Sequence, residues 1–211
     1  FALIQYQKTL QQRNALLKYF AKNRTFDLDS LEIYNDPLTK FGTQIFEKRQ
    51  RFVASILPTI QHFYEIISKG NEKVTVIYES NLNEQNFEEI LSENLEKDRV
   101  LTYTSRGIHK DDLRFVMNGN LIKKFGSQGQ QKSFLIALKL AQIKRIKDIT
   151  NKNPILLLDD IFDKLDDNRV SQLIELVNQQ NFGQISITDT HRERTESVVK
   201  RINEESKIFQ I

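Results

Sequence analysis

The sequence predicts a mixed α/β protein in which a helical arm precedes a part built on a parallel sheet. Two observations support this fold class. Apolar residues recur at helical spacing through roughly the first 70 residues. After residue 152, short apolar strand patterns alternate with helical patterns, which is typical of parallel strands joined by crossover helices.

The composition is that of an ordinary folded protein. Hydrophobic residues make up 39% of the 211 residues, charged residues make up 28%, and the formal net charge is +3. No apolar run approaches the roughly 20 residues that a membrane-spanning helix needs. The net charge is too small to indicate nucleic-acid binding, so only local clusters could do so. The absence of cysteine excludes disulfides, thiolate metal sites and cysteine nucleophiles, and it fits a cytoplasmic protein.

Two helical segments account for the first 70 residues, and together they predict an antiparallel helical arm. Asp27, Asp29 and Ser30 separate the segments as capping residues. Arg13 interrupts the apolar stripe of the first segment, residues 1–22. The stripe residues are Leu3, Tyr6, Leu10, Leu17 and Phe20 in the first segment and Leu31, Tyr34, Leu38, Phe41, Ile45 and Phe52 in the second, residues 30–69. The arm could pack on its own domain or form an intermolecular coiled coil.

The proline and glycine residues give further expectations for the arm. We expect Pro37 in the first turn of a helix and Pro58 to kink or split the second segment, because proline removes a backbone donor. Gly70-Asn71 should end that segment. Because the chain begins with Phe1 inside a helical pattern, we expect it to be a fragment of a longer protein.

The remaining residues predict a succession of short elements. Asn118-Gly119 is a strong hairpin-turn signal. The other expected elements are strands at 74–78, 100–104, 113–117, 155–158, 184–188 and 207–211 and helices at 84–97, 128–150, 167–180 and 192–203.

Two adjacent carboxylates follow the strand at 155–158. Four apolar residues predict a buried strand, and ligands bind at the carboxyl ends of such strands in parallel sheets. Asp159 could hold Mg²⁺, which prefers hard oxygen ligands, and Asp160 could polarise a water for attack on a phosphate. This is the Walker B arrangement. The alternative is a core strand that ends in a solvated acidic turn.

A loop with two glycines, residues 126–133, directly precedes the helical residues 134–150. Glycines allow a backbone to approach a phosphate, a helix N-terminus offers unpaired N–H groups, and Ser127 and Gln130 add neutral donors. A P-loop requires glycine where Gln131 stands, so we reject that assignment. The loop reads better as x-S-x-G-Q, the signature loop of ABC-type ATPases. The alternative is an ordinary helix-capping turn.

The order of these motifs is more specific than any one of them. The signature loop, a helix and Walker B come in the order found in ABC-type ATPases. Residues 163–166 then match the short D-loop of such proteins. The strand at 184–188 ends in Asp189-Thr190-His191, where a switch residue contacting the γ-phosphate belongs, and any of these three residues could be the switch.

These motifs resemble those of the RecF family of DNA-repair ATPases, relatives of the SMC proteins. Residues 12–18 are similar to the family's helix after its first lobe, and residues 105–113 resemble its G-x-H-[RK]-x-D-L loop, with Ile108 where proline is usual. Residues 127–132 resemble its S-x-G-Q-Q-[RK] signature, and residues 156–162 resemble its Walker B.

The resemblance implies a remnant of an ABC/SMC-like ATPase head that lacks the family's P-loop. Residues 1–70 would form the helical arm of lobe II, residues 71–152 the rest of lobe II, and residues 153–211 the C-terminal part of lobe I. ATP and Mg²⁺ would be held between two full-length protomers, with the fragment alone inactive and the full-length dimer a weak ATPase. The implied roles are metal ligand for Asp159, catalytic residue for Asp160, and nucleotide contacts for Ser127, Gly129, Gln130 and His191.

The resemblance also implies DNA as a ligand and an ATP-dependent homodimer that works with RecO and RecR in recombinational repair and the SOS response. The residues themselves add a local basic excess at 132–152, because this segment has six basic residues and only one acidic residue, Asp148. Such an excess could track DNA phosphates, although a solvated helix face is the alternative. The candidates are Lys132, Lys139, Lys144, Arg145 and Lys147, with Arg13 and Lys18 in a second patch.

Two other functions stay open. One is a non-enzymatic helical adaptor that recruits partners through residues 1–69. The other is a stand-alone NTPase with a degenerate P-loop at 126–133, which requires the strand before Gly126 to lie beside the 155–158 strand in one sheet. The signature interpretation instead places the loop in the helical lobe, far from Asp159 of the same chain. We expect His109, Asp111 and Asp112 to form a structural or solvated loop.

Overall fold

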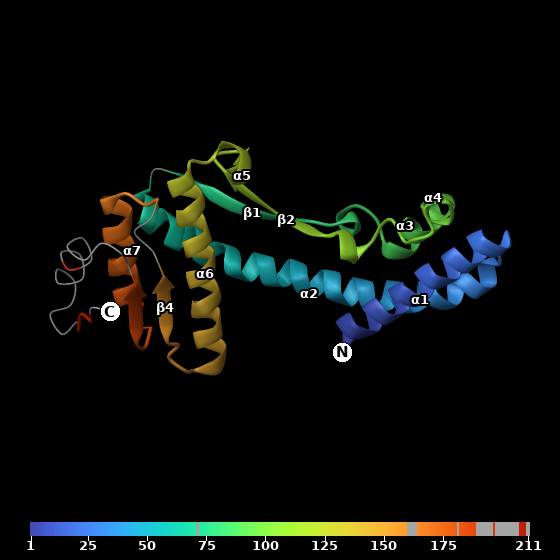
Figure 1. The fold of residues 1–211 in the computed structure, drawn as a ribbon, viewed down its shortest axis with the longest axis horizontal. Coiled ribbons are helices and arrows are strands. Elements are labelled where there is room, and N and C mark those ends of the chain that lie inside the picture. The colour runs from blue at the N-terminus through green and yellow to red at the C-terminus, as the bar shows by residue number, and fades with distance from the viewer. Residues whose placement is uncertain (71, 160–163, 181, 189–195, 197–206, 210–211) are drawn as a thin grey trace. The chain divides into compact units, whose positions relative to one another are not determined.

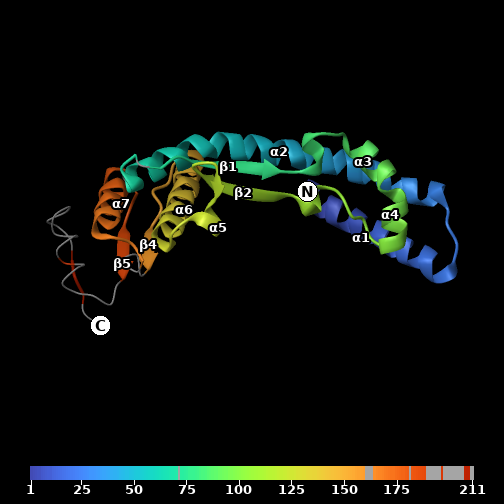
Figure 2. The same cartoon turned by 90° about the horizontal axis from the view of Figure 1, so that it is seen from above.

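The computed structural model describes residues 1–70, 72–159, 164–180, 182–188, 196 and 207–209. The fold is mixed α/β and contains a parallel strand pair, which confirms the predicted class (Figures 1 and 2). The chain divides into two compact units. The first unit contains residues 1–55 and 77–114, and the second contains residues 56–76 and 115–211.

The first unit is built on an antiparallel pair of helices, α1 (Ala2–Asn23) and the first part of α2 (Leu28–Ser68). Arg24 adopts a left-handed conformation that ends α1, and the Asp27 carboxylate accepts a hydrogen bond from the Asp29 N–H at the start of α2. Leu17 and Leu31 are buried together in this helical hairpin. The prediction of an antiparallel arm is therefore confirmed.

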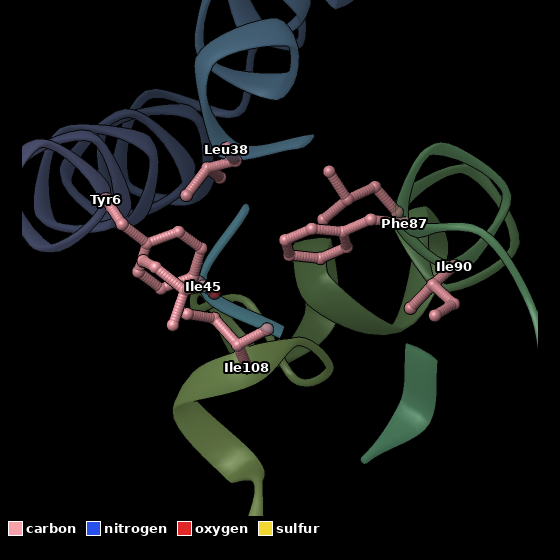
Figure 3. Close-up of a cluster of buried hydrophobic side chains, with 7 residues drawn as sticks. Tyr6, Leu38, Ile45, Phe87, Ile90 and Ile108 are labelled. Atoms are coloured by element: carbon pink, nitrogen blue, oxygen red, sulfur yellow. The ribbon is translucent and has the colours of Figure 1, made fainter. Parts of the chain in front are cut away.

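A hydrophobic cluster joins this hairpin to the shorter elements of the first unit (Figure 3). Tyr6 comes from α1, Leu38 and Ile45 come from α2, and Phe87 comes from α3 (Phe87–Glu93). Ile108, in a short 3-10 helix (Ile108–Lys110), completes the cluster from a loop far along the chain. Side chains separated by about 100 residues thus hold the loop at 104–111 against the two helices.

Several expectations about α2 are wrong. The helix is continuous, so Pro37 lies well inside it and Pro58 does not split it, while a kink at Pro58 stays a prediction. Buried residues on either side of Pro58, such as Ile56 and Ile60, hold the helix together despite the lost hydrogen bond. Phe52 is 48% exposed and leaves the apolar stripe.

The segment at 84–104 also differs from the expectation of one helix and one strand. It forms two helices, α3 and α4 (Leu95–Leu101), after a 3-10 helix (Asn81–Asn83). Asn86 caps α3, and the left-handed Thr102 ends α4. Val100 is 82% exposed on α4, so its β-branched side chain has no sheet to pack against.

A small sheet with the order β1-β2-β3 follows the predicted strands. Its strands are β1 (Val74–Glu79), β2 (Asp112–Met117) and β3 (Asn120–Leu121). The strands β2 and β3 pair antiparallel around Asn118 and Gly119, whose φ angles of 48° and 81° confirm the predicted turn. A short helix, α5 (Ile122–Phe125), leads from β3 to the signature loop.

The second unit ends in a parallel strand pair with two helices. Its elements are α6 (Gln128–Thr150), β4 (Leu156–Asp159), α7 (Asp167–Gln179) and β5 (Ile185–Thr188). The register runs from Leu156 opposite Ile185 to Asp159 opposite Thr188, and β4 lies beside α6 and α7 in both views (Figures 1 and 2). The crossover strand–helix–strand pattern predicted for this part is confirmed.

The expected burial of the whole strand at 155–158 is wrong. Leu156 is buried, whereas Ile155 and Leu157 are 68% and 74% exposed. Alternate side chains of a strand point to opposite faces, and only one face of β4 is covered within the described residues. The helix expected at 192–203 lies outside the described residues except for position 196, and the described residues 207–209 of the expected last strand form no strand. No helix in the described ranges is long and apolar enough to span a membrane.

Candidate functional site

The signature loop is closed by a reciprocal pair of hydrogen bonds at the start of α6. The Gln130 N–H donates to Ser127 Oγ over 3.2 Å, and the Ser127 N–H donates to Gln130 Oε1 over 2.7 Å. This capping box arises because the sequence places Ser and Gln at the N-cap and third helical positions. It fixes the direction in which the loop enters the helix.

Two backbone donors of the loop remain free. Among the residues that the structure describes, the N–H groups of Gln128 and Gly129 have no hydrogen-bond partner. They lie at the positive end of a helix of 23 residues, where an anion is stabilised. Ser127 is exposed beside them, and its hydroxyl hydrogen is available because Oγ only accepts from Gln130. The loop can therefore receive a phosphate group through one hydroxyl and two backbone donors.

Gly129 also sets how closely the loop approaches the segment after β4. A Cβ atom at this position would lie 3.0 Å from the backbone oxygen of Lys164. The loop and Asp159 belong to the same compact unit. The division of the chain into two lobes, and the separation of Ser127 from Asp159, stay predictions.

The side chain of Gln130 leads to a polar network that the sequence did not reveal. Its Nε2 donates to Glu72 Oε1 over 2.8 Å, and Arg169 Nη2 donates to the same oxygen over 3.0 Å. Tyr64 donates its hydroxyl to Glu72 Oε2. Burial alone would raise the pKa of Glu72, but the bonds from Gln130, Tyr64 and Arg169 outweigh burial and hold this pKa below its ordinary value. Glu72 is therefore a carboxylate at neutral pH.

The predicted metal ligand lies at the carboxyl end of β4. Asp159 is exposed there, and its Oδ1 accepts a hydrogen bond from the hydroxyl of Thr188 at the end of β5. The parallel register places these two residues opposite each other. Asp160 and His191 lie outside the described residues, as does the start of the D-loop at Asp163.

The end of the D-loop caps the next helix. Asp166 Oδ1 accepts a hydrogen bond of 2.9 Å from the Arg169 N–H at the start of α7. The helices α6 and α7 run side by side in the same direction, since Arg169 reaches Ser133 near their starts and Lys147 reaches the carbonyl of Gln180 near their ends. Two helix N-termini, each capped by its own side chain, thus lie next to each other.

The strand preceding the loop does not belong to the sheet of β4. The strand β3 pairs with β2 in one sheet, while β4 pairs with β5 in another. A degenerate P-loop at 126–133 would need both strands in one sheet, as P-loops join a strand to a helix across it. That alternative is therefore wrong.

The basic candidates differ in their accessibility. Arg13 is 0% exposed, and its guanidinium bonds to Asp98, Asn35 and Thr104 in the first unit. A buried and paired guanidinium cannot reach DNA phosphates, so the expectation for Arg13 is wrong. Lys18 on α1 is exposed.

On α6, the basic candidates have mixed surroundings. Lys139 and Arg145 are exposed, and Lys132 is partly buried. Lys144 forms an ion pair of 3.4 Å with Asp148, four residues further along the helix, while Lys147 donates to a backbone carbonyl. Lys139 and Arg145 therefore stay accessible on this helix, whereas Lys144 and Lys147 make contacts within the unit.

The loop at 105–113 is held by hydrogen bonds within the first unit. His109 Nε2 lies 3.0 Å from the carbonyl oxygen of Thr104, so this nitrogen carries the proton, and the Tyr6 hydroxyl donates to Nδ1 over 2.9 Å. Burial lowers the pKa of His109. Asp111 accepts from Arg49 and Tyr78, whereas Asp112 is exposed. These contacts are those of a structural loop.

Curated relatives cover almost the whole chain. No protein-family model matches it. A protein of Flavobacterium johnsoniae named DNA replication and repair protein RecF is 56% identical over 209 residues, which are 99% of this chain and 58% of the relative. A protein of the same name from Phocaeicola vulgatus is 45% identical over 211 residues, which are 100% of this chain and 56% of the relative. The chain belongs to the RecF family.

Solved structures agree with this assignment. A structure described as the recombination mediator protein RecF-ATP in the RecFOR pathway is 31% identical, with a TM-score of 0.77 over 91% of this chain and 52% of that one. The RecF-ATPrS structure of the same pathway has a TM-score of 0.75 over 92% of this chain. The RecF-family chain spans just over half the length of the curated relatives that it matches.

Proposed function

We propose that this RecF-family chain supplies the signature loop and the Walker B strand of an ATP site shared by two copies of the full-length protein, and that this site serves DNA replication and repair. The observation that carries the proposal is the free donor set at the start of α6. Ser127, Gln128 and Gly129 offer a hydroxyl and two N–H groups at a helix N-terminus.

The chemistry of this donor set suits a γ-phosphate. Backbone N–H groups and a hydroxyl donate without bringing a positive charge, so the loop binds a phosphate that already carries its own cation. The side chain and the N–H of Gln130 are both used within the protein, so Gln130 acts by shaping the loop. Ser127 and Gly129 then contact the nucleotide of the partner copy. ATP joins two protomers in this arrangement, and its hydrolysis releases them.

The other half of the site is the carboxyl end of β4. Asp159 fits Mg²⁺ because its exposed carboxylate supplies a hard oxygen, while the Thr188 hydroxyl orients it by bonding to Oδ1. When bound, Mg²⁺ neutralises phosphate charge. By resemblance to the family, Asp160 activates water and His191 is the switch residue.

The proposed biological setting follows the family. The two relatives are named DNA replication and repair proteins, and the two solved structures are assigned to the RecFOR pathway. We place the full-length dimer on gapped or duplex DNA in the cytoplasm, with RecO and RecR as partners and a role in the SOS response. Lys139, Arg145 and Lys18 are the exposed candidates for phosphate contacts.

The test is a substitution that fills the space in front of the free donors of Ser127, Gln128 and Gly129. In the full-length protein, Ser127→Arg should abolish ATP-dependent dimers, measured by light scattering after size-exclusion chromatography, because the side chain occupies the space of the phosphate. ATP binding by the monomer should survive. Ser92→Arg, on the exposed face of α3, is the matched control and should dimerise normally. Normal dimers of the Ser127→Arg protein would refute the shared site.

A further inference from the structure

One carboxylate joins the starts of two helices in the second unit. Glu72 Oε1 lies 2.8 Å from Nε2 of Gln130, in the first turn of α6, and 3.0 Å from Nη2 of Arg169, in the first turn of α7. A carboxylate is stabilised near helix N-termini by their positive dipole ends. Glu72 therefore stabilises the N-termini of α6 and α7 next to each other.

Arg169 extends this link in two further directions. Its Nη1 donates to Ser133 Oγ over 3.1 Å, back to α6, and its Nε lies 3.4 Å from Asp166 Oδ2 at the end of the D-loop. The planar guanidinium holds these partners at fixed angles, which a lysine could not do. Its own side chain is only 16% exposed, so water competes weakly for these bonds.

The contacts form one continuous path between two loops. It runs from Ser127 through Gln130 and Glu72 to Arg169 and then to Asp166. A second, independent contact supports the path, because Gly129 allows the backbone of the signature loop to lie against Lys164 O. The loop before α6 and the segment before α7 are thus joined by side chains and by backbone.

We infer that Glu72 and Arg169 are positioning residues that make the signature loop and the D-loop segment at 164–168 move as one element. This inference rests on the proposed shared ATP site. A phosphate of the partner copy that binds the signature loop then also fixes the segment that follows Walker B. Phosphate binding at the signature loop of one protomer therefore also affects the Walker B side of that same protomer.

The position of the pair favours this role over simple stabilisation of the unit. The interior contacts of α7 come from apolar residues further along the helix, such as Val170, Leu173 and Val177. Glu72 and Arg169 lie at the helix starts, beside the two loops, and Arg169 bonds to Asp166 at the end of the D-loop and to Ser133 on α6.

The first test does not require ATP. Hydrogen exchange of the full-length protein, without nucleotide, is measured for Arg169→Ala and for Asn168→Ala, which removes an exposed side chain one residue earlier. The hydrogen-bonded amides of 126–131, which are those of Gly126, Ser127, Gln130 and Gln131, should exchange about tenfold faster in Arg169→Ala, and so should the protected amides of 164–168, as expected when a hydrogen bond to a charged group is lost. Asn168→Ala should leave 126–131 unchanged. Unchanged exchange at 126–131 in Arg169→Ala, or faster exchange throughout 170–177 as well, would overturn the inference.

The second test uses the shared site. The ATP concentration that gives half-maximal dimer should rise about tenfold in Arg169→Ala and in Glu72→Gln, while ATP binding by the monomer is unchanged. Arg169→Lys should recover little, since it restores the charge without the fork geometry. Wild-type dimerisation by Arg169→Ala would also overturn the inference. If the wild-type protein forms no ATP-dependent dimer, the proposed function fails, and the exchange measurement still decides whether the two loops are linked.

Discussion

In each compact unit an arginine–carboxylate pair brings distant segments together, but the two pairs, Arg13 with Asp98 and Arg169 with Glu72, have different surroundings. In the first unit, Arg13 Nη1 lies 2.8 Å from Asp98 Oδ2, and the side chains are 0% and 1% exposed. In the second unit, Arg169 and Glu72 are 3.0 Å apart and are 16% and 11% exposed. The first pair is sealed in the interior, whereas the second lies at helix ends beside two loops.

The difference in burial gives the two pairs different consequences. A fully buried ion pair must be complete, because either charge alone would be left without water or a partner. Nε and Nη1 of Arg13 bond to Asn35, Asp98 and Thr104, Nη2 is buried with no hydrogen-bond partner among the described residues, and Asp98 also accepts from the Ser105 N–H. A pair at the margin can lose a member and still be hydrated. We therefore expect the first pair to decide stability and the second to decide loop position.

The largest expected effect comes from breaking the sealed pair. Asp98→Ala leaves Arg13 charged and buried and removes the acceptor of the Ser105 N–H, so the free energy of unfolding should fall by about 3–5 kcal/mol. Urea denaturation of this chain measures the change. Glu96→Ala, which removes the exposed partner of Arg99 two residues earlier, should change it by less than about 0.5 kcal/mol.

The double variant Arg13→Met with Asp98→Leu sharpens this result. It removes both charges and should recover much of the lost stability, because no uncompensated charge is left. An Asp98→Ala protein as stable as the Glu96→Ala control would show that Arg13 is hydrated in solution, and the contrast between the two pairs would disappear.

A glycine in each unit provides the next comparison. Gly107 has a φ of 129°, and a Cβ there would lie 2.7 Å from the ring of Phe87 in the hydrophobic cluster. Gly107→Ala should reduce the free energy of unfolding by about 2–4 kcal/mol, since it adds backbone strain and overpacking. Gly129→Ala meets only one backbone oxygen at 3.0 Å and gains helix propensity, so its change should be about 1 kcal/mol or less.

The same two variants should rank in the opposite order for function. Gly129→Ala pushes the signature loop away from Lys164 and should weaken ATP-dependent dimers of the full-length protein. Gly107→Ala should leave the dimers intact wherever the protein remains folded. Urea midpoints and light scattering of both variants give the two rankings, and identical rankings would contradict the division of roles between the units.

The sequence predicted the elements that depend on local signals. The turn at Asn118-Gly119 and the parallel strands β4 and β5 follow from residues close together in the chain. The motif order also identified the family. Arg13 was misjudged because its helical position looks like a break in the apolar stripe, and only its partner 85 residues away shows that it belongs to the core.

Long-range partners explain the other failures. Pro58 reads as a helix breaker unless the burial of Ile56 and Ile60 is known. Glu72 and Arg169 carry no motif and are 97 positions apart, so nothing in the sequence pairs them. A glutamate just before β1 and an arginine in the first turn of α7 are both typical of solvent-exposed positions in a sequence. Only the folded structure shows that the two side chains meet.

The smallest expected effect is a difference between the two units in how their stability depends on pH. Burial lowers the pKa of His109, so the unfolded chain takes up a proton near pH 6.5 while folded His109 stays neutral. Stability should therefore fall as the pH drops through about 6.5, and stop falling on this account below the folded pKa. For Glu72, burial would raise the pKa, but Gln130, Tyr64 and Arg169 outweigh it, and the folded pKa lies below the usual value. The stability due to Glu72 is present above about pH 4.3 and is lost as the pH falls from there through the folded pKa.

Two variants assign these windows to the two units. His109→Gln should flatten the dependence of the urea midpoint between about pH 7.5 and 5.5, and Glu72→Gln should flatten it only below about pH 4.5. The exposed His62, replaced by Gln, is the control for the upper window and should leave its slope unchanged. The upper slope should be modest, because the bond to the Thr104 carbonyl opposes the effect of burial on His109. If the upper slope persisted in His109→Gln, the proton would be taken up elsewhere, and the lowered pKa of His109 would not be the cause of the upper window.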